Sequence, residues 1–449
     1  MSWRVNRFAS ALYAVAFEVL VWSVLTPLEL ARVVLGRSTV ADLAERLAWN
    51  AVPPKRSRYR LLVHAVSAGE MSAAGALVEA LSDVLPSSTV LLSSHTTTGR
   101  RVARDLERLP AVESAVLLPW DRRAALRAWF ARLEVDAVVF VETEIWPGAY
   151  LACADLGRPL VIVSGRLAAH DIWRYRLARP VFAAALETAR WVGVQDVPRQ
   201  AAFRRIGSPA ARTEVIGDLK ADAAMRPVDP LPPEWQQSLA GGRPLLVAGS
   251  THAPEERLLV AAFARLRVNW PLLRLVVAPR RVGRTRTLAR RLAQPGLRVA
   301  RWSRGPRPSD DWDILLVDRF GPLRALYRFA DIAFIGGTMS RAGGHNVLEA
   351  AAAGCAIIVG TNVEDIRSTV DGLDASNAVR RVSGDGDCVA RLHDTIEALL
   401  ANPEVRIGLG RRAKAYVEAQ GGVGRRYATR IATVLSPEPQ PAPTRRSAR

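Results

Sequence analysis

The stretch LLVHAVSAGEMSAAGALVEAL, residues 61–81, contains both kinds of element from which the fold is built. Its first six residues form an apolar run typical of a buried strand, and its alanine-rich second half has the spacing of a helix. The turn between them contains one acid, Glu70. Such strand-to-helix turns place ligand-contacting groups in α/β proteins, so Glu70 is a candidate functional residue. A carboxylate in the first turn also stabilises the helix by itself, and this structural role remains open.

The alternation of short apolar runs and longer helical segments continues through most of the chain. Seven strands are expected within residues 59–218 and five more within residues 243–361. Uninterrupted Val, Leu and Ile runs separated by amphipathic helices are typical of parallel sheets covered on both faces. A proline-rich stretch divides the two series, and the C-terminal residues lack apolar side chains. The pattern predicts an N-terminal doubly wound α/β domain at residues 39–221, followed by a linker at residues 222–240. A C-terminal α/β domain is expected at residues 241–434, and a disordered tail at residues 435–449.

Residues 8–28 form a long apolar segment with a single charged residue, Glu18. The segment is long enough to cross a bilayer, but a charge near its middle is costly there. Aromatic residues punctuate it, as is common at a lipid interface. We therefore expect residues 1–38 to associate with a membrane, either flat in the interface or as one span. A buried helix of the first domain is the alternative.

The overall charge favours anionic partners. The chain has 62 Lys and Arg against 43 Asp and Glu, a formal net charge of +19. Phospholipid head groups, phosphorylated substrates and nucleic acid would all suit such a surface. The three cysteines, Cys153, Cys355 and Cys388, are widely spaced, which fits a reducing compartment and argues against a cysteine-based zinc site. We expect no structural metal.

In the second half, residues 334–360 have the pattern strand, glycine loop, helix, strand. Gly343 and Gly344 let the backbone approach a ligand closely, and a helix beginning near Asn346 would offer unpaired N–H groups. This pattern predicts an anion site suited to a nucleotide phosphate. In the alternative interpretation, Asn346 and Glu349 only form a helix cap, because N-x-x-E has capping-box spacing.

Two further strand ends in the second half are polar. Ser250 and Thr251 follow one strand and precede a helix, where they could contact a ligand or merely cap that helix. Arg280 and Arg281 follow the next strand, and a solvated charge pair is the ordinary interpretation. In an open α/β domain, however, these strand ends point into one crevice.

The first half has three other candidate stretches. Glu142 and Glu144 lie two apart at the end of an apolar strand, so both side chains are expected to face the same way. They could serve acid–base chemistry, or one could brace a helix terminus. The hydroxyl-rich loop containing Thr98 and Gly99 could bind sugar hydroxyls or cap a helix. Residues 164–180 are rich in Arg and aromatic side chains, which predicts a basic surface patch.

The order of these motifs resembles that of a known family. The motifs HAVSAGE, TTTGR, LPWD, ETEIWP, GRL followed by RY, VQD, LKAD, AGSTH, APR and GGHNVLE occur together over roughly residues 20–420. They run in the order found in the bacterial 3-deoxy-D-manno-octulosonic acid (Kdo) transferases of lipopolysaccharide assembly. The resemblance implies a GT-B fold, with two domains facing a central cleft, an N-terminal membrane anchor and a metal-independent inverting transfer without a cofactor. It also implies a location at the cytoplasmic face of the inner membrane.

The resemblance further implies substrates and site residues. The donor would be CMP-Kdo. The acceptor would be the phosphorylated, acylated glucosamine disaccharide that precedes lipid A. The other partners would be membrane lipids, and no nucleic acid would be bound. Glu70 matches the family's proposed general base. The positions that match the CMP pocket are Arg280, Asn346 and Glu349, with Gly321 near the cytosine. Arg166 is our candidate for the cation that binds the donor's carboxylate.

Some positions depart from the family's pattern. Pro322 follows Gly321 where family members usually have Glu, and Asn362 stands where the family has the His of GPH. These departures favour a rival hypothesis, a GT-B transferase or epimerase that uses a different nucleotide sugar. A second rival is a membrane-bound basic scaffold without a nucleotide pocket, but it leaves the glycine-rich strand ends unexplained.

Overall fold

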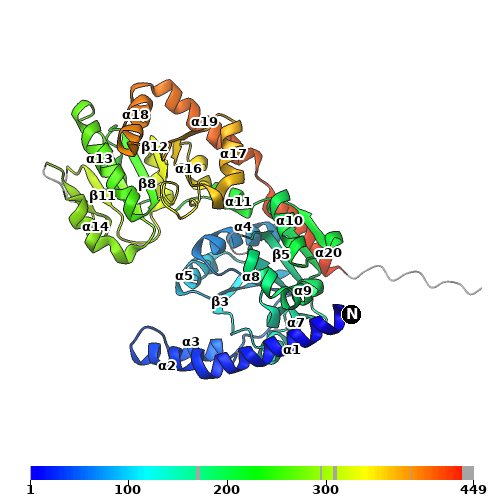
Figure 1. The fold of residues 1–449 in the computed structure, drawn as a ribbon. Coiled ribbons are helices and arrows are strands. Elements are labelled where there is room, and N and C mark those ends of the chain that lie inside the picture. Colours follow the sequence, from blue (N-terminus) through cyan, green and yellow to red (C-terminus); the bar gives the residue numbers. More distant parts are fainter. Residues whose placement is uncertain (1, 168–171, 294–295, 307–310, 385, 437–449) are drawn as a thin grey trace, which may run out of the picture. The chain divides into compact units, whose positions relative to one another are not determined.

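The computed structural model describes residues 2–167, 172–293, 296–306, 311–384 and 386–436 (Figure 1). The chain divides into two compact units. Unit 1 comprises Met1–Ala223 and the C-terminal segment from Gly422, and unit 2 comprises Ala224–Gly421.

Unit 1 is built on a parallel sheet of seven strands with the order β3-β2-β1-β4-β5-β6-β7. In chain order the strands are β1 (Tyr59–His64), β2 (Ser88–Ser94), β3 (Val112–Leu117), β4 (Ala137–Val141), β5 (Leu160–Gly165), β6 (Trp191–Val194) and β7 (Thr213–Val215). Both faces of the sheet are buried: Leu62 belongs to one hydrophobic core, whereas its neighbours Leu61 and Val63 belong to another. Burial on both faces explains the continuous apolar runs of the sequence.

Helices cover both faces of this sheet (Figure 1). They include α4 (Ala68–Val84), α5 (Thr97–Asp105), α6 (Arg123–Leu133), α7 (Pro147–Asp155), α8 (Ile172–Leu177), α9 (Arg179–Thr188), α10 (Val197–Ile206) and α11 (Leu219–Met225). Strand order reverses between β1 and β4, which pair with each other although β2 and β3 lie between them in the chain. The carboxyl ends of β1 and β4 therefore flank the point at which α/β sheets usually bind ligands.

Unit 2 repeats this architecture with the strand order β10-β11-β9-β8-β12-β13-β14, again all parallel. The strands are β8 (Leu245–Thr251), β9 (Arg274–Pro279), β10 (Val299–Arg301), β11 (Ile314–Leu316), β12 (Ile332–Ile335), β13 (Ala356–Val359) and β14 (Val379–Arg381). The helices include α12 (Pro233–Leu239), α13 (Ala253–Asn269), α14 (Thr285–Leu292), α15 (Leu323–Leu326), α16 (Leu348–Ala352), α17 (Arg367–Ala375), α18 (Cys388–Ala401) and α19 (Pro403–Ala419). The strand order of this sheet reverses between β8 and β12.

The twelve expected strands are all present, and two unexpected ones, β10 and β14, complete the second sheet. The division into units differs from the expected boundaries. Helix α20 (Val423–Leu435) packs on α4 and belongs to unit 1, because Tyr427 and Ile431 are buried in its core. The expected linker also contains α12, whose Trp235 is buried in the core of unit 2. Of the expected tail, the part beyond residue 436 lies outside the described residues.

The N-terminal segment is an almost continuous helix made of α1 (Ser2–Leu20), the π-helical turn Val21–Leu25 and α2 (Thr26–Val34). Residues Phe8–Val34 form one helix long and apolar enough to cross a membrane by length and composition. One side of this helix packs on the rest of unit 1. Tyr13 donates a hydrogen bond to Asp121 (2.7 Å), Arg122 pairs with Glu18 (2.8 Å), and Val21 is fully buried.

Candidate active site

The turn from β1 into α4 fixes the position of Glu70. Ser67 is the N-cap of α4 and accepts a hydrogen bond from the backbone N–H of Glu70 (3.2 Å). The Glu70 carboxylate accepts in return from the backbone N–H groups of Ser67 (3.2 Å) and Val66 (2.9 Å). Glu70 therefore has the structural role of the alternative interpretation, a carboxylate that stabilises the first turn of the helix, and the structure shows that it acts through a capping box. This cap also holds the carboxylate at the carboxyl end of β1, where strand order reverses.

The loop between β2 and α5 braces this turn. Ser94 and Thr96 both donate hydroxyl hydrogen bonds to the Val66 carbonyl, at 3.0 and 2.6 Å. Thr96 also caps α5 by accepting from the Gly99 N–H (3.0 Å). Gly99 is buried, and a Cβ at this position would overlap Ser94 Oγ and the Val66 carbonyl oxygen. Gly99 thus permits the close approach of loop and turn, whereas Thr98 is exposed.

The acids after β4 do not follow the strand alternation we expected. Strand β4 ends at Val141, and Glu142 has a φ of 65°, so the chain leaves the extended conformation at that residue. Glu142 is only 3% exposed and forms an ion pair with Lys220 (2.5 Å). Burial by itself lowers the pKa of Lys220, but the carboxylates of Glu142 and Asp218 outweigh it, and the net pKa is raised.

Glu144 takes a different partner from Glu142. Its carboxylate accepts from the indole N–H of Trp146 (2.5 Å). Burial, followed by the nearby charge of Glu70, raises the pKa of Glu144 to about 8. Burial and the charge of Glu142 likewise raise the pKa of Glu70. The three acids thus interact electrostatically at one end of the sheet, and Glu144 holds its proton at neutral pH.

Arg166 follows β5, the next strand of the sheet, and is partly buried. Its backbone carbonyl accepts from the Thr143 hydroxyl (2.5 Å), and its charge lowers the pKa of Lys220. Unit 1 therefore brings Glu70, Glu142, Glu144, Arg166 and Lys220 to the carboxyl ends of neighbouring strands. The sequence analysis assigned no role to Lys220 or Asp218. The signal for Lys220 was the LKAD motif at residues 219–222, and Asp218 directly precedes that motif.

In unit 2, Ser250 and Thr251 do not cap α13 as the alternative interpretation held. Thr251 is the last residue of β8, is fully buried and donates to Glu256 (3.2 Å). Ser250 has a left-handed φ of 56°. The N-cap is His252, whose backbone N–H donates to the buried Glu255 carboxylate (2.8 Å). Glu255 also accepts from the N–H groups at positions 337 and 339, at 3.0 and 2.9 Å, and thereby fixes the loop after β12.

Asn346 and Glu349 do not form the capping box of the alternative interpretation, because the N-cap of α16 is Val347, which makes no side-chain cap hydrogen bond. The Asn346 side chain accepts from the backbone N–H of Leu348 (3.1 Å) and donates to Glu349 (3.1 Å). The helix that follows, α16, has only five residues, so its dipole is small. Gly343 and Gly344 both have positive φ values, 79° and 90°, which suit glycine alone.

The remaining predicted residues lie on neighbouring strand ends of unit 2. Arg280 follows β9, and its backbone N–H donates to the Thr251 carbonyl (3.0 Å). Its charge contributes, after burial, to lowering the pKa of His345 to about 4. Gly321 lies beyond β11 with a φ of 123° and with open space around its Cα. Sequence reasoning gave no role to His252 or His345, although both belong to quoted motifs.

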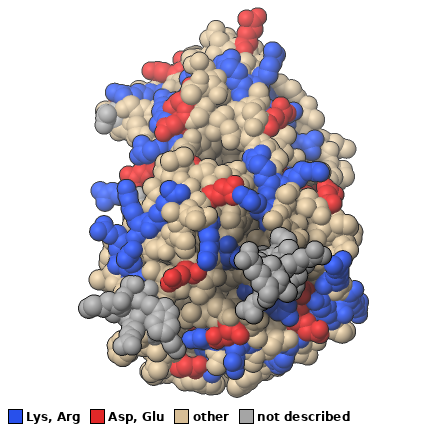
Figure 2. Space-filling model, turned by 90° about the vertical axis from the view of Figure 1, so that its right-hand side faces the viewer, with Lys and Arg blue, Asp and Glu red and all other residues tan. Residues whose placement is uncertain are grey.

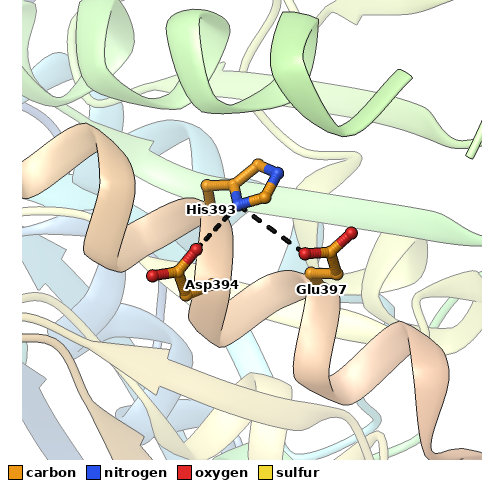
Figure 3. Close-up of side chains that lie close together, drawn as sticks. All are labelled: His393, Asp394 and Glu397. Atoms are coloured by element: carbon orange, nitrogen blue, oxygen red, sulfur yellow. Dashed lines mark hydrogen bonds and ion pairs between the residues drawn. The ribbon is translucent and has the colours of Figure 1, made fainter. Parts of the chain in front are cut away.

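One group of His and acidic side chains in the described part of the chain is compact enough to hold a metal ion (Figure 3). His393, Asp394 and Glu397 lie on α18, with His393 Nδ1 2.9 Å from Asp394 and 3.9 Å from Glu397. The Asp394 side chain is 74% exposed, and Glu397 also accepts from Asn269 (3.0 Å). These contacts are those of a polar, solvent-exposed helix surface.

Comparisons with known proteins agree with the motif order. A family model described as 3-deoxy-D-manno-octulosonic-acid transferase (kdotransferase) matches residues 41–223. The 3-deoxy-D-manno-octulosonic acid transferase of Bordetella pertussis is 32% identical over 381 residues, covering 81% of this chain and 85% of the relative. That of Haemophilus influenzae is 28% identical over 380 residues, covering 82% and 85%.

Two solved structures have a similar fold. The UDP-GlcNAc 2-epimerase from Neisseria meningitidis covers 84% of this chain and 99% of its own, with a TM-score of 0.57 and 13% identity. The glycotransferase of kitacinnamycin covers 85% and 100%, with a TM-score of 0.51 and 17% identity. At these identities the likeness concerns the fold alone, which is GT-B-like: two parallel seven-stranded sheets with helices. The sequence relationship goes further, and the chain belongs to the family of Kdo transferases, glycosyltransferases of lipopolysaccharide synthesis.

Proposed function

We propose that this Kdo transferase moves Kdo from CMP-Kdo onto the phosphorylated, acylated glucosamine disaccharide that precedes lipid A. The transfer inverts the anomeric configuration, and Glu70 is the general base. The position of Glu70 is the observation that carries the proposal. Its carboxylate lies where strand order reverses in unit 1, and burial raises its pKa, as a general base requires.

In the proposed reaction, Glu70 takes the proton of an acceptor hydroxyl while that oxygen attacks the anomeric carbon of Kdo. The new C–O bond forms as the bond to the CMP phosphate breaks, and the bonding electrons leave with CMP. A positioned base contributes roughly 10²–10⁴-fold to the rate of such a step. The two backbone hydrogen bonds to Glu70 fix the direction of its carboxylate without occupying all of its acceptor positions.

The departing CMP phosphate requires positive groups. Arg280 supplies a charge at the end of β9, and the positive-φ backbone at Gly344 permits close approach of the loop to the phosphate. Asn346 and Glu349 hold the loop through their mutual hydrogen bond, and Gly321 leaves space for the cytosine of CMP. Ser250 and Thr251 line the neighbouring strand end. Since α16 is short, we assign the stabilisation of the phosphate charge to Arg280 and the glycine loop rather than to a helix dipole.

The acceptor side of the site has its own polar groups. Arg166 is the proposed partner of the Kdo carboxylate, and the exposed Thr98 hydroxyl is available to sugar hydroxyls. Glu144 is protonated at neutral pH, so it can donate a hydrogen bond to the acceptor. Glu142 acts through Lys220, which it holds beside Glu70.

The acceptor is an amphiphile, and the N-terminal helix suits a membrane surface at the cytoplasmic face of the inner membrane. Phe8, Leu12, Val15 and Val19 are each at least 61% exposed and recur at helical spacing along one side of α1. The opposite side is attached to the rest of unit 1 through the hydrogen bond of Tyr13 to Asp121 and through other contacts. A helix attached in this way favours lying in the interface over spanning the bilayer. Figure 2 shows Lys and Arg side chains spread over the surface, and the formal net charge of +19 suits anionic lipid.

A donor panel tests this function. The full chain in detergent is incubated with the lipid A precursor and labelled CMP-Kdo, generated in situ, or labelled UDP-sugars in parallel reactions. The proposal predicts transfer from CMP-Kdo and none from UDP-sugars. Transfer or epimerisation of a UDP-sugar, with CMP-Kdo untouched, would contradict it and would support the rival nucleotide-sugar enzyme.

A further inference from the structure

Two histidines meet at the point in unit 2 where strand order reverses. His252 directly follows β8, and His345 lies in the glycine loop after β12; the two strands are hydrogen-bonded neighbours although more than 80 residues separate them in the chain. The His345 ring packs against Gly337, where a Cβ would come within 3.1 Å of ring atom Cδ2. Both imidazoles therefore lie at the carboxyl ends of β8 and β12.

The two rings form a hydrogen-bonded pair. Their Nε2 atoms are 2.8 Å apart, and the rings are nearly parallel, with centroids 5.1 Å apart and an interplanar angle of 11°. Two ring nitrogens at this distance share one hydrogen, so one ring donates and the other accepts. Burial and the Arg280 charge lower the pKa of His345 to about 4, so this ring is neutral at neutral pH.

The surroundings determine which ring donates. The capping box of α13 places the His252 side chain against the backbone N–H of Glu255, a donor that suits a ring nitrogen without a hydrogen. Since Nε2 of His252 is engaged with His345, the accepting atom is Nδ1, and the ring hydrogen of His252 is therefore on Nε2. His252 donates to Nε2 of His345, which leaves the hydrogen of the His345 ring on Nδ1.

The charge around the pair favours an anion. Three backbone N–H groups, at positions 252, 337 and 339, occupy the carboxylate of Glu255, the acid that contacts both strand ends. Arg280 brings a positive charge to the same edge of the sheet, because its backbone N–H donates to the carbonyl of Thr251, the residue before His252 (3.0 Å). An N–H donor beside a guanidinium at a strand-order reversal is an arrangement suited to phosphate.

We propose that His345 donates an Nδ1–H hydrogen bond to the phosphate of the nucleotide donor, and that His252 is a positioning residue that fixes the tautomer and orientation of His345. The proposal deepens the proposed function and rests on it for the identity of the nucleotide. During transfer the donated hydrogen bond would strengthen as the phosphate of the leaving group gains charge. The histidine pair transfers no proton in this step.

Isosteric variants separate the two ring nitrogens. Asn at position 345 keeps a donor near Nδ1 but loses the contact with His252, whereas Gln keeps that contact and loses Nδ1. Binding of CMP and of cytidine to the full chain in detergent is measured by calorimetry, so that the ratio of the two affinities isolates the phosphate. His345→Gln is expected to lower the CMP/cytidine ratio by roughly 10–100-fold, the usual size of one hydrogen bond to a charged group, and His345→Asn by less.

The positioning role has its own rescue test. His252→Ala should lower the CMP/cytidine ratio, and His252→Gln, which keeps a donor at the position of Nε2, should restore most of it. Unchanged ratios in His345→Gln and His252→Ala would overturn the proposal. If the wild type binds UMP more tightly than CMP, the proposed function fails. The role of the His252–His345 pair is then tested with the same variants on the ratio of UMP to uridine affinity. A wild type that gains no affinity from the phosphate of either nucleotide overturns the pair as well.

Discussion

Replacing Lys220 by methionine tests whether the buried ion pair between Lys220 and Glu142, which lies beside Glu70, stabilises unit 1. Lys220→Met keeps the length and apolar stem of the side chain but removes the charge that Glu142 faces at 2.5 Å. Glu142 is 3% exposed, so the variant would leave a nearly buried carboxylate without its cation. Breaking such a pair costs about 3–5 kcal/mol; because the Lys220 side chain is 20% exposed, we expect about 3 kcal/mol.

The loss is measured as a change in melting temperature by calorimetry of the full chain. For a unit of this size, each kcal/mol corresponds to roughly 2–4 °C, so the melting temperature of unit 1 should fall by about 6–12 °C. The double variant Lys220→Met/Glu142→Gln should recover at least half of this loss, since it no longer buries an unpaired charge.

A matched control has the same ion-pair distance but more exposure. Arg430 pairs with Glu214 at 2.5 Å in unit 1, with side chains 47% and 40% exposed, so Arg430→Met should cost only about 0–1 kcal/mol. Equal melting temperatures for Lys220→Met and Arg430→Met would refute the reasoning. So would a double variant less stable than Lys220→Met itself.

Two further predictions concern the same end of the sheet. Gly99→Ala should lower the free energy of unfolding by about 1–3 kcal/mol and impair transfer, because the added methyl overlaps the Val66 carbonyl oxygen of the Glu70 turn. Gly69→Ala is the control in thermal melts, since its Cβ meets nothing nearer than 4.0 Å. Equal melting temperatures of the two variants would contradict the prediction. The pKa of Glu144 is raised to about 8, so the folded chain binds this proton more tightly than the unfolded chain does. The free energy of unfolding therefore falls as pH rises from about 4.5 to 8, because the unfolded chain releases the proton first. Glu144→Gln should therefore reduce the fall in melting temperature between pH 5 and 8, and an unchanged pH profile would disprove it.

The long buried strands were predictable because parallel sheets covered on both faces need continuous apolar runs. The two strands that were not predicted, β10 and β14, are the outer strands of the second sheet and have only three residues each. Their sequences, VAR and VRR, contain arginines, since an edge strand is not buried on both faces. Helix α20 follows the second sheet in the chain but packs on α4, and no local pattern reveals such a return to the first unit.

The candidate site was predictable only in part. Glu70, Glu142 and Glu144 follow strands and are acidic in a basic chain, so residue type and position identified them. Their partners were not apparent, because Lys220 comes from a helix almost 80 residues further along the chain. The contact of His252 with His345 likewise depends on strand order in the sheet, which a sequence pattern does not specify.

Transfer of labelled Kdo from CMP-Kdo to the lipid A precursor by Glu70→Gln tests the central claim most directly. Gln can still accept the backbone hydrogen bonds of Val66 and Ser67, so the helix cap is retained while the proton acceptor is lost. Asp83→Asn, at the exposed end of the same helix, is the control. We predict a rate lowered by roughly 10²–10⁴-fold in Glu70→Gln at an unchanged melting temperature, and wild-type rates in the control. Near-normal transfer by a folded Glu70→Gln enzyme would contradict the assignment of Glu70 as the base.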